Sequence, residues 1–124
     1  MADPIVFIVD DDESVRRALM RLMKSAEFEA RAFSSAEDFL SQGCQDAQSC
    51  LILDMRMPGM DGLELQERLR ESVYRIPIVF ITAHEDTVAR EQAMRGGALA
   101  FLQKPFEDQV LIDAVNLALR GSGQ

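Results

Sequence analysis

Five residues, spread over most of the sequence, have the greatest potential for chemistry: Asp10, Asp11, Asp54, Thr82 and Lys104. Carboxylate oxygens are the ligands that a hard divalent cation such as Mg²⁺ prefers, and such a cation would keep neighbouring carboxylates ionised. A hydroxyl and an ammonium group opposite the cation would suit an anion with several oxygens, and a phosphoryl group fits because cation and lysine can share its charge. If these residues meet, Asp54 could act as a nucleophile.

Asp54 follows an apolar run, residues 50–53, and precedes a loop that contains Pro58, Gly59 and Gly62. This pattern predicts a buried strand whose last side chain emerges into a loop. One aspartate at such a place could equally cap a helix or order the loop. The interpretation therefore depends on what the other strands carry at their ends.

The second acidic feature is the uninterrupted run from Asp10 to Glu13. Four consecutive acids repel one another unless a cation joins them. They follow residues 5–9, whose continuous β-branched and aromatic character predicts a strand covered on both faces. Asp12 or Ser14 could cap the next helix, and Asp12 could instead strengthen metal binding.

The remaining sequence alternates strand and helix patterns. The predicted strands after residues 5–9 are 29–33, 50–53, 78–81 and 98–102, and the predicted helices follow Ser14, Ser35 and Asp61 and span 86–95 and 108–120. We expect Gly43 and Gly96-Gly97 to end helices, residues 44–49 to form a loop, Val73 and Val110 to lie on apolar helix faces, and Arg16, Arg17, Arg21 and Lys24 to face water.

Five alternating strand-helix units predict an α/β fold, a doubly wound parallel sheet with right-handed crossovers and helices on both faces. In such a sheet, the carboxyl ends of all strands lie along one edge. The five residues named above come directly after, or at the end of, four of these strands. We therefore expect them to converge.

Composition limits the possible classes of protein. A chain of 124 residues fits one domain, no apolar run approaches the roughly 18 residues of a membrane span, and no secretory signal precedes residue 10. Two cysteines, Cys44 and Cys50, are too few for a disulfide framework, so we expect reduced thiols and a cytoplasmic location. The net charge of −8 argues against direct nucleic-acid binding by this domain.

Four motifs together resemble response-regulator receiver domains of the CheY-like superfamily. They are Ile8-Val9-Asp10-Asp11, the segment from Leu53 to Gly62, Ile81-Thr82-Ala83 and Lys104-Pro105-Phe106. The likeness covers residues 1–120 as the receiver domain and leaves 121–124 as a tail or linker stub. Arg56-Met57-Pro58, Thr82-Ala83-His84 and the segment 104–108 are most similar to the FixJ-like receivers of two-component transcription regulators.

The resemblance implies a five-stranded flavodoxin-like sheet of order 2-1-3-4-5 with five helices. It implies that Asp54 accepts a phosphoryl group from the phosphohistidine of a sensor histidine kinase. Mg²⁺, or Mn²⁺ in its place, would be bound by Asp11, Asp54 and the backbone carbonyl of Arg56, with Asp10 acting through a water. Lys104 and Thr82 would bind phosphoryl oxygens, and the Lys104–Pro105 bond would be cis.

The resemblance also implies a switch. Thr82 would move toward the phosphoryl group and Phe101 would turn inward, which changes the surface of the fourth helix, fifth strand and fifth helix and could promote a homodimer. The output would be transcription, through a partner or a C-terminal domain outside this chain. Such a domain catalyses its own phosphorylation and dephosphorylation but is a signalling switch rather than a turnover enzyme. Arg56 and His84 are candidates for tuning these rates.

Three other classes of protein fit these residues less well. A phosphatase of the haloacid-dehalogenase kind would need Asp-x-Asp after the first strand, whereas Met55-Arg56 follow Asp54. A flavin-binding protein would need a Ser/Thr/Gly phosphate loop where this chain has four acids. A pseudo-receiver that binds partners without phosphorylation would not need the full set of acids, Thr82 and Lys104. Gly96-Gly97, in place of the commoner Ala-Gly, could alter the mobility of the fourth helix.

Overall fold

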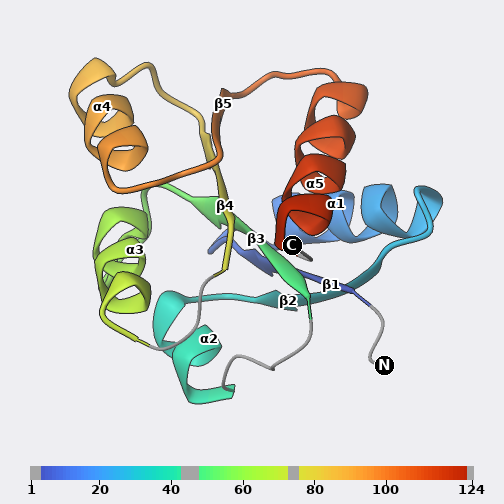
Figure 1. Cartoon of the computed structure of the whole chain (residues 1–124), viewed down its shortest axis with the longest axis horizontal. Helices are drawn as coiled ribbons and strands as arrows, with labels where there is room; N and C mark the ends of the chain where they lie inside the picture. The colour runs from blue at the N-terminus through green and yellow to red at the C-terminus, as the bar shows by residue number, and fades with distance from the viewer. Residues whose placement is uncertain (1–3, 43–47, 73–75, 123–124) are drawn as a thin grey trace.

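The computed structural model describes residues 4–42, 48–72 and 76–122, with the side chains of residues 121 and 122 excepted. Its elements, in chain order, are β1 (Ile5–Val9), α1 (Glu13–Ser25), β2 (Glu29–Phe33), α2 (Ala36–Gln42), β3 (Ser49–Asp54), α3 (Gly62–Arg70), β4 (Ile78–Thr82), α4 (Thr87–Arg95), β5 (Ala100–Gln103) and α5 (Asp108–Ser122). All strand pairs are parallel, in the order β2-β1-β3-β4-β5 (Figure 1). The predicted fold class is confirmed.

The sheet separates two layers of helices. Figure 1 shows α1 and α5 on one face and α2, α3 and α4 on the other. Alternate residues of each strand pack against opposite helix layers. In β3, Leu51 and Leu53 belong to the core beneath α2, α3 and α4, whereas Cys50 and Ile52 belong to the core beneath α1 and α5. The continuous apolar runs of the central strands follow from this burial on both faces.

The strand register brings the chain's polar strand ends to one edge. Val9 pairs with Leu53, so the next residues, Asp10 and Asp54, lie side by side. Thr82 ends β4 and pairs with Gln103, which places Lys104 one residue beyond that pair. Four elements therefore deliver their polar ends to the same region, as the topology predicts.

Side chains fix where two of the helices begin. Asp12 caps α1, because its Oδ1 accepts hydrogen bonds from the backbone N–H of Ser14 at 2.8 Å and of Val15 at 3.4 Å. Asp61 and Glu64 form a capping box at the start of α3. Of the two predicted roles for Asp12, the structure supports the cap.

Some predicted boundaries were wrong by one or two residues. Ser49 belongs to β3 rather than to the preceding loop. Asp86 precedes α4 as its N-cap, because its carboxylate accepts the N–H of Ala89. Strand β5 begins at Ala100, because the N–H of Ala98 is bonded to the Ala93 carbonyl at the end of α4.

Helix α5 differs from the prediction in two respects. Helix α5 continues to Ser122, two residues beyond the predicted end. Val110 is 44% exposed instead of lying on the apolar face of α5, because the buried residues Leu111, Val115 and Ala118 define a different side of the helix. The predictions for Gly43, residues 44–47 and Val73 concern positions outside the described residues.

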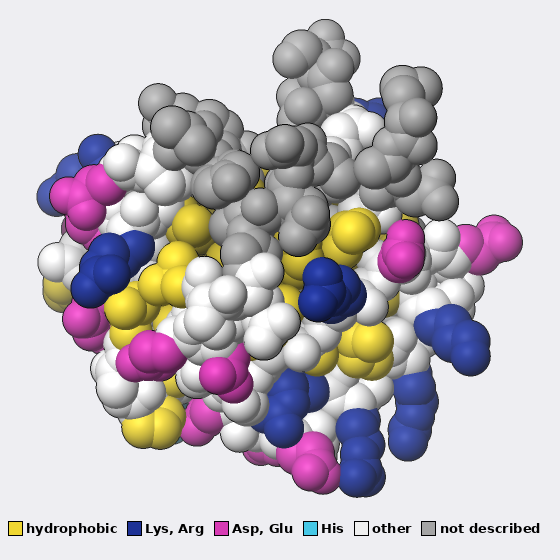
Figure 2. Space-filling model, turned by 90° about the horizontal axis from the view of Figure 1, so that it is seen from below, with side chains coloured by type: hydrophobic (Ala, Val, Ile, Leu, Met, Phe, Trp, Pro, Cys, Tyr) yellow, Lys and Arg dark blue, Asp and Glu magenta, His cyan; other side chains and the backbone are white. Residues whose placement is uncertain are grey.

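The surface carries charges of both signs. Figure 2 shows Lys and Arg side chains standing beside Asp and Glu side chains on one face, with apolar side chains between them. Within the described ranges, no helix has the length and apolar character needed to cross a membrane.

Close packing at Gly62 yields a prediction about stability. A Cβ at this position would lie 2.7 Å from the Asp54 carbonyl oxygen and 3.0 Å from the ring of Phe80. Because neither group is a flexible side-chain end, we expect Gly62→Ala to lower the free energy of unfolding by about 1–3 kcal/mol, measured by urea denaturation.

Gly96→Ala is the matched control. Its Cβ would lie equally close to an atom, 2.7 Å from Oε1 of Gln66, but this is the end of a side chain that can turn away. The cost should be about one net hydrogen bond, roughly 1 kcal/mol, since Nε2 of Gln66 donates to the Ala93 carbonyl at 2.9 Å. If Gly96→Ala lowered the free energy of unfolding more than Gly62→Ala, this explanation would be contradicted.

Candidate functional site

Three carboxylates meet at the carboxyl edge of the sheet. Each of Asp10, Asp11 and Asp54 has a carboxylate oxygen within 4.8 Å of the corresponding oxygens of the other two. Asp10 is only 1% exposed and Asp54 only 8%, whereas Asp11 is exposed to solvent. The cluster is therefore buried on one side and accessible on the other.

Strand alternation explains why Asp10 and Asp54 share a side of the sheet. Asp10 follows Val6 and Ile8 at two-residue spacing, and Asp54 follows Cys50 and Ile52 in the same way. These four apolar residues all belong to the core beneath α1 and α5, so both carboxylates are on that side of the sheet. Backbone bonds hold the ends of both strands in place. The N–H of Asp10 donates to the Phe33 carbonyl at 3.2 Å.

Lys104 provides a cation beside the carboxylate of Asp10. Its Nζ lies 3.6 Å from Oδ2 of Asp10, and its backbone N–H donates to the Thr82 carbonyl at 2.7 Å. The Lys104–Pro105 peptide bond is cis, as the resemblance implies. At 3.6 Å the ammonium is an ion-pair partner rather than a hydrogen-bond donor, and Oδ2 of Asp10 is buried without a hydrogen bond from the described residues.

The electrostatics of the cluster are unfavourable in the absence of a cation. Burial, followed by the negative charge of Asp10, raises the pKa of Asp54 to about 7, although Lys104 and the backbone N–H of Arg56 act in the opposite direction. Burial likewise raises the pKa of Asp10. Closely spaced oxygens, one of them without a hydrogen bond, and a raised pKa together fit a site for a divalent cation.

Thr82 and Phe101 lie on the neighbouring strands β4 and β5, two positions apart in the register, because Thr82 pairs with Gln103 and Phe101 pairs with Phe80. Thr82 is buried, and its hydroxyl accepts the His84 N–H and donates to the His84 carbonyl, both at 3.2 Å. Phe101 is half-buried, with its ring 6.1 Å from the ring of Phe80. The side chain of His84 itself is exposed.

Arg56 links two loops at the rim of the site. Its guanidinium donates to Oδ2 of Asp86 at 2.9 Å, and the other oxygen of that carboxylate caps α4. Asp86 was not among the predicted site residues. The only signal in the sequence was that opposite charges follow two strands that were predicted to lie near each other.

The prediction that Arg16 faces water was wrong. Arg16 is half-buried, and its Nη1 donates to the carbonyl oxygen of Asp10 at 2.8 Å. The charge of this residue suggested the solvent, but Arg16 lies three and seven residues before the buried Leu19 and Met23, on the same face of α1, and its long side chain turns back over the first turn of the helix. Arg17 is exposed, as expected, and pairs with Glu13 at 2.9 Å.

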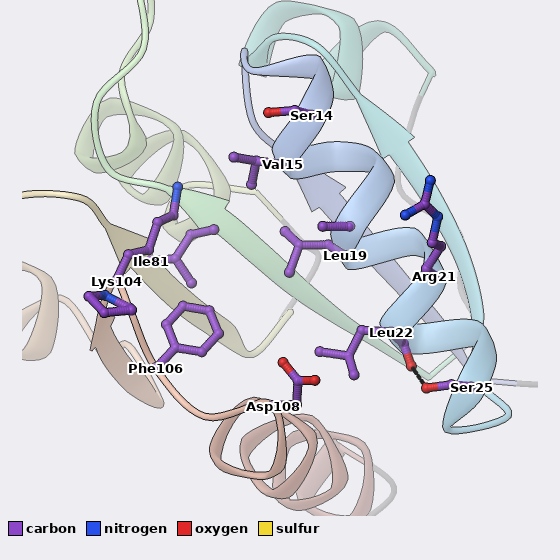
Figure 3. A pocket seen from close by; sticks show the side chains of 12 residues that line it. Ser14, Val15, Leu19, Arg21, Leu22, Ser25, Ile81, Lys104, Phe106 and Asp108 are labelled. Atoms are coloured by element: carbon purple, nitrogen blue, oxygen red, sulfur yellow. Dashed lines mark hydrogen bonds between the residues drawn. The ribbon is translucent and has the colours of Figure 1, made fainter.

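An open hollow of about 720 Å³ borders the cluster between α1 and α5. Figure 3 shows Val15, Leu19, Ile81 and Phe106 pointing into it, and Arg21 on the far side of α1. Lys104 lines the same hollow, so it lies between the carboxylates and an apolar surface that is accessible from outside.

Fold and site together define a class of protein: a parallel α/β domain with a carboxylate cluster and a lysine at the carboxyl edge of its sheet. The family model described as response regulator receiver domain matches residues 6–116. The chain therefore belongs to the response regulator receiver domain family.

Relatives support this assignment. The chain is 50% identical over 111 residues to Nodulation protein W of Bradyrhizobium diazoefficiens, which covers 90% of this chain and 49% of that protein. It is 40% identical over 118 residues to Transcriptional regulatory protein FixJ of Rhizobium meliloti, covering 95% and 58%. The solved structure of the response regulator StyR superposes with a TM-score of 0.92 at 51% identity, covering 98% of this chain and 62% of that one. The predicted similarity to FixJ is confirmed, and the chain spans about half the length of the curated relatives it matches.

The raised pKa of Asp54 predicts how stability depends on pH in metal-free protein. A carboxyl whose pKa is higher in the folded state than in the unfolded chain binds more protons when folded, so its contribution to stability is lost as the pH rises from about 4 to about 7. Asn at this position carries no such charge. We therefore expect Asp54→Asn to be more stable than the wild type at pH 8 in EDTA, by on the order of 2–4 kcal/mol, and the difference to vanish near pH 4.

Urea denaturation at several pH values measures this difference. Asp108→Asn removes one exposed negative charge on α5 and controls for net charge. Equal stability of Asp54→Asn and wild type at pH 8 would show that the folded protein tolerates the buried charge without cost.

Proposed function

We propose that this receiver domain accepts a phosphoryl group on Asp54 in a reaction that depends on Mg²⁺. The observation that carries the proposal is the cluster of Asp10, Asp11 and Asp54 oxygens within 4.8 Å, with the ammonium of Lys104 beside it. Membership of the receiver family supports the same conclusion.

Each residue has one role in this proposal. Asp11, Asp54 and the backbone carbonyl of Arg56 would hold the cation directly, and Asp10 would hold it through a water. When bound, Mg²⁺, or Mn²⁺ in its place, supplies positive charge that offsets the charge of the phosphoryl oxygens. Lys104 binds one phosphoryl oxygen, and Thr82 binds another after its hydroxyl leaves the backbone of His84.

The transfer is a substitution at phosphorus. A carboxylate oxygen of Asp54 forms the new O–P bond while the N–P bond of a phosphohistidine breaks, and the electron pair of that bond returns to the imidazole, which takes up a proton. The donor would be a sensor histidine kinase. Catalysis by position and charge is the usual pattern for phosphoryl transfer. The protein thus promotes its own modification, and later its hydrolysis, without turning over an external substrate.

The switch begins at Thr82. Its movement toward the phosphoryl group would vacate space beside β4 and β5, and the half-buried ring of Phe101 would turn into that space. The response would be read at the surface formed by α4, β5 and α5. Arg56 and His84, at the rim of the site, would tune the rates of phosphorylation and hydrolysis.

We further propose that the output is control of transcription in the cytoplasm, through a partner or through a domain beyond this chain, and that the receiver itself does not contact nucleic acid. The printed name of FixJ describes a transcriptional regulatory protein, and this chain corresponds to about half of such relatives. A pseudo-receiver remains the alternative. The unfavourable electrostatics around Asp54 argue against it, because a binding module without a cation would gain nothing from them.

Phosphorylation by a small donor tests the proposal. Incubated with acetyl phosphate and Mg²⁺, the chain should gain the mass of one phosphoryl group, and the gain should disappear in EDTA and in Asp54→Asn. Lys104→Met should slow the reaction by about 100-fold, since it removes a cation that stabilises the transferring group. Intact-mass spectrometry over time measures both effects.

Lys24→Met is the matched control, because Lys24 is the only other lysine in the sequence and lies exposed on α1. It should react at the wild-type rate. A chain that gains no mass under any condition would support the pseudo-receiver.

Self-association is the second test. With Mg²⁺ and beryllium fluoride, a stable phosphoryl analogue, we expect a dimer through α4, β5 and α5, detected by size-exclusion chromatography with light scattering. Val88 is 66% exposed on α4, so Val88→Ser should weaken the dimer. Ala18→Ser, on the exposed side of α1, should not. If the elution profiles with and without the analogue coincide at high concentration, the dimer hypothesis fails.

A further inference from the structure

The loop from Asp10 to Asp12 presents the exposed member of the carboxylate cluster. The side chain of Asp11 is accessible to solvent, so its position relative to Asp10 and Asp54 is set mainly by its backbone. A ligand on an unsupported loop would bind a cation weakly, because the loop would have to become ordered first.

Two hydrogen bonds hold that backbone, one on each side of Asp11. On the N-terminal side, the carbonyl oxygen of Asp10, which belongs to the Asp10–Asp11 peptide group, accepts Nη1 of Arg16 at 2.8 Å. On the C-terminal side, the N–H of Asp12 donates to Oδ1 of Asp10 at 2.9 Å. The peptide groups that flank Asp11 are therefore both anchored, and only the first depends on a residue outside the loop.

The backbone of Arg16 is itself held in place. Its backbone N–H donates to the Asp12 carbonyl at 3.0 Å in the first turn of α1, and Asp12 caps that helix. The side chain is half-buried and lines a polar hollow together with Arg31, Ser34 and Asp38. Arg16 thus connects the first turn of α1 to the acidic loop.

We propose that Arg16 is a positioning residue for the cation site: its guanidinium fixes the Asp10–Asp11 peptide and thereby holds the Asp11 carboxylate where it can bind Mg²⁺. The proposal rests on the proposed function of the carboxylate cluster and extends it to a residue that touches neither the cation nor the phosphoryl group.

A purely electrostatic role would have the opposite consequence. Arg16 places a positive charge at the backbone of the acidic loop, so its charge alone disfavours a second cation nearby. Removing that charge should strengthen Mg²⁺ binding if position does not matter. Removing the hydrogen bond should weaken Mg²⁺ binding if Arg16 acts as we propose, and the sign of the change separates the two roles.

The experiment compares Arg16→Met with Arg17→Met in the full 124-residue chain. Both variants lose one positive charge and keep an unbranched apolar stem, but among the described residues the side chain of Arg17 bonds only the exposed Glu13. Titration with MgCl₂, followed by amide chemical shifts in NMR spectra, gives the dissociation constant. We expect Arg16→Met to weaken Mg²⁺ binding by about tenfold, in the range known for loss of an outer-shell partner, and Arg17→Met to bind as tightly as the wild type or more tightly.

A second measurement does not depend on the metal. In EDTA, the backbone order parameters of Asp11 and Asp12 should fall from near 0.85, the value of rigid backbone, toward about 0.6 in Arg16→Met and remain unchanged in Arg17→Met. Unchanged order parameters, or Mg²⁺ affinity equal to or above that of Arg17→Met, would overturn the proposal. If the wild type shows no response to Mg²⁺, the proposed function fails, and the order parameters still decide whether Arg16 positions the loop.

Discussion

The repulsion between the buried carboxylates of Asp10 and Asp54 is the constraint on which the rest of the site depends. The parallel register sets these residues side by side at the edge of the sheet, where burial removes the water that would stabilise their charge. Lys104 offsets part of this repulsion from 3.6 Å. Burial, followed by the repulsion that remains, raises the pKa of Asp54 to about 7, and a divalent cation bound here would lower it again.

Hydrogen bonds connect this cluster to the helices around it. Arg16 joins the acidic loop to α1, Arg56 joins the loop after β3 to the N-cap of α4, and the hydroxyl of Thr82 holds the backbone of His84. At the other end of α4, the buried side chain of Gln66 binds the Ala93 carbonyl. Helix α4 is thus attached at both ends to elements that begin close to Asp54. A change of charge at Asp54 can reach α4 through contacts that already exist in the resting structure.

The sequence was sufficient to predict the fold and the convergence of the main polar residues, because both follow from local periodicity and from the geometry of parallel sheets. The proximity of Asp10 and Asp54 could be predicted from their positions at the ends of two strands alone. The hydrogen bond of Arg16 could not be predicted, since only the folded loop places the Asp10 carbonyl within reach of its guanidinium. The Arg56–Asp86 pair spans 30 residues and depends on two loop conformations. Nothing in the sequence marks Gln66 as buried, because its partner, the Ala93 carbonyl, becomes available only when α4 packs against α3.

Titration of the Asp54 carboxyl tests the central claim most directly. The ¹³C chemical shift of this carboxyl, assigned by comparison with Asp54→Asn, can be followed from pH 3 to pH 9 in EDTA and again in Mg²⁺. The account predicts a midpoint near pH 7 without metal, well above the ordinary value of 3.8, and a clear fall when Mg²⁺ is added. A midpoint near 3.8 in EDTA, unaffected by Mg²⁺, would contradict it.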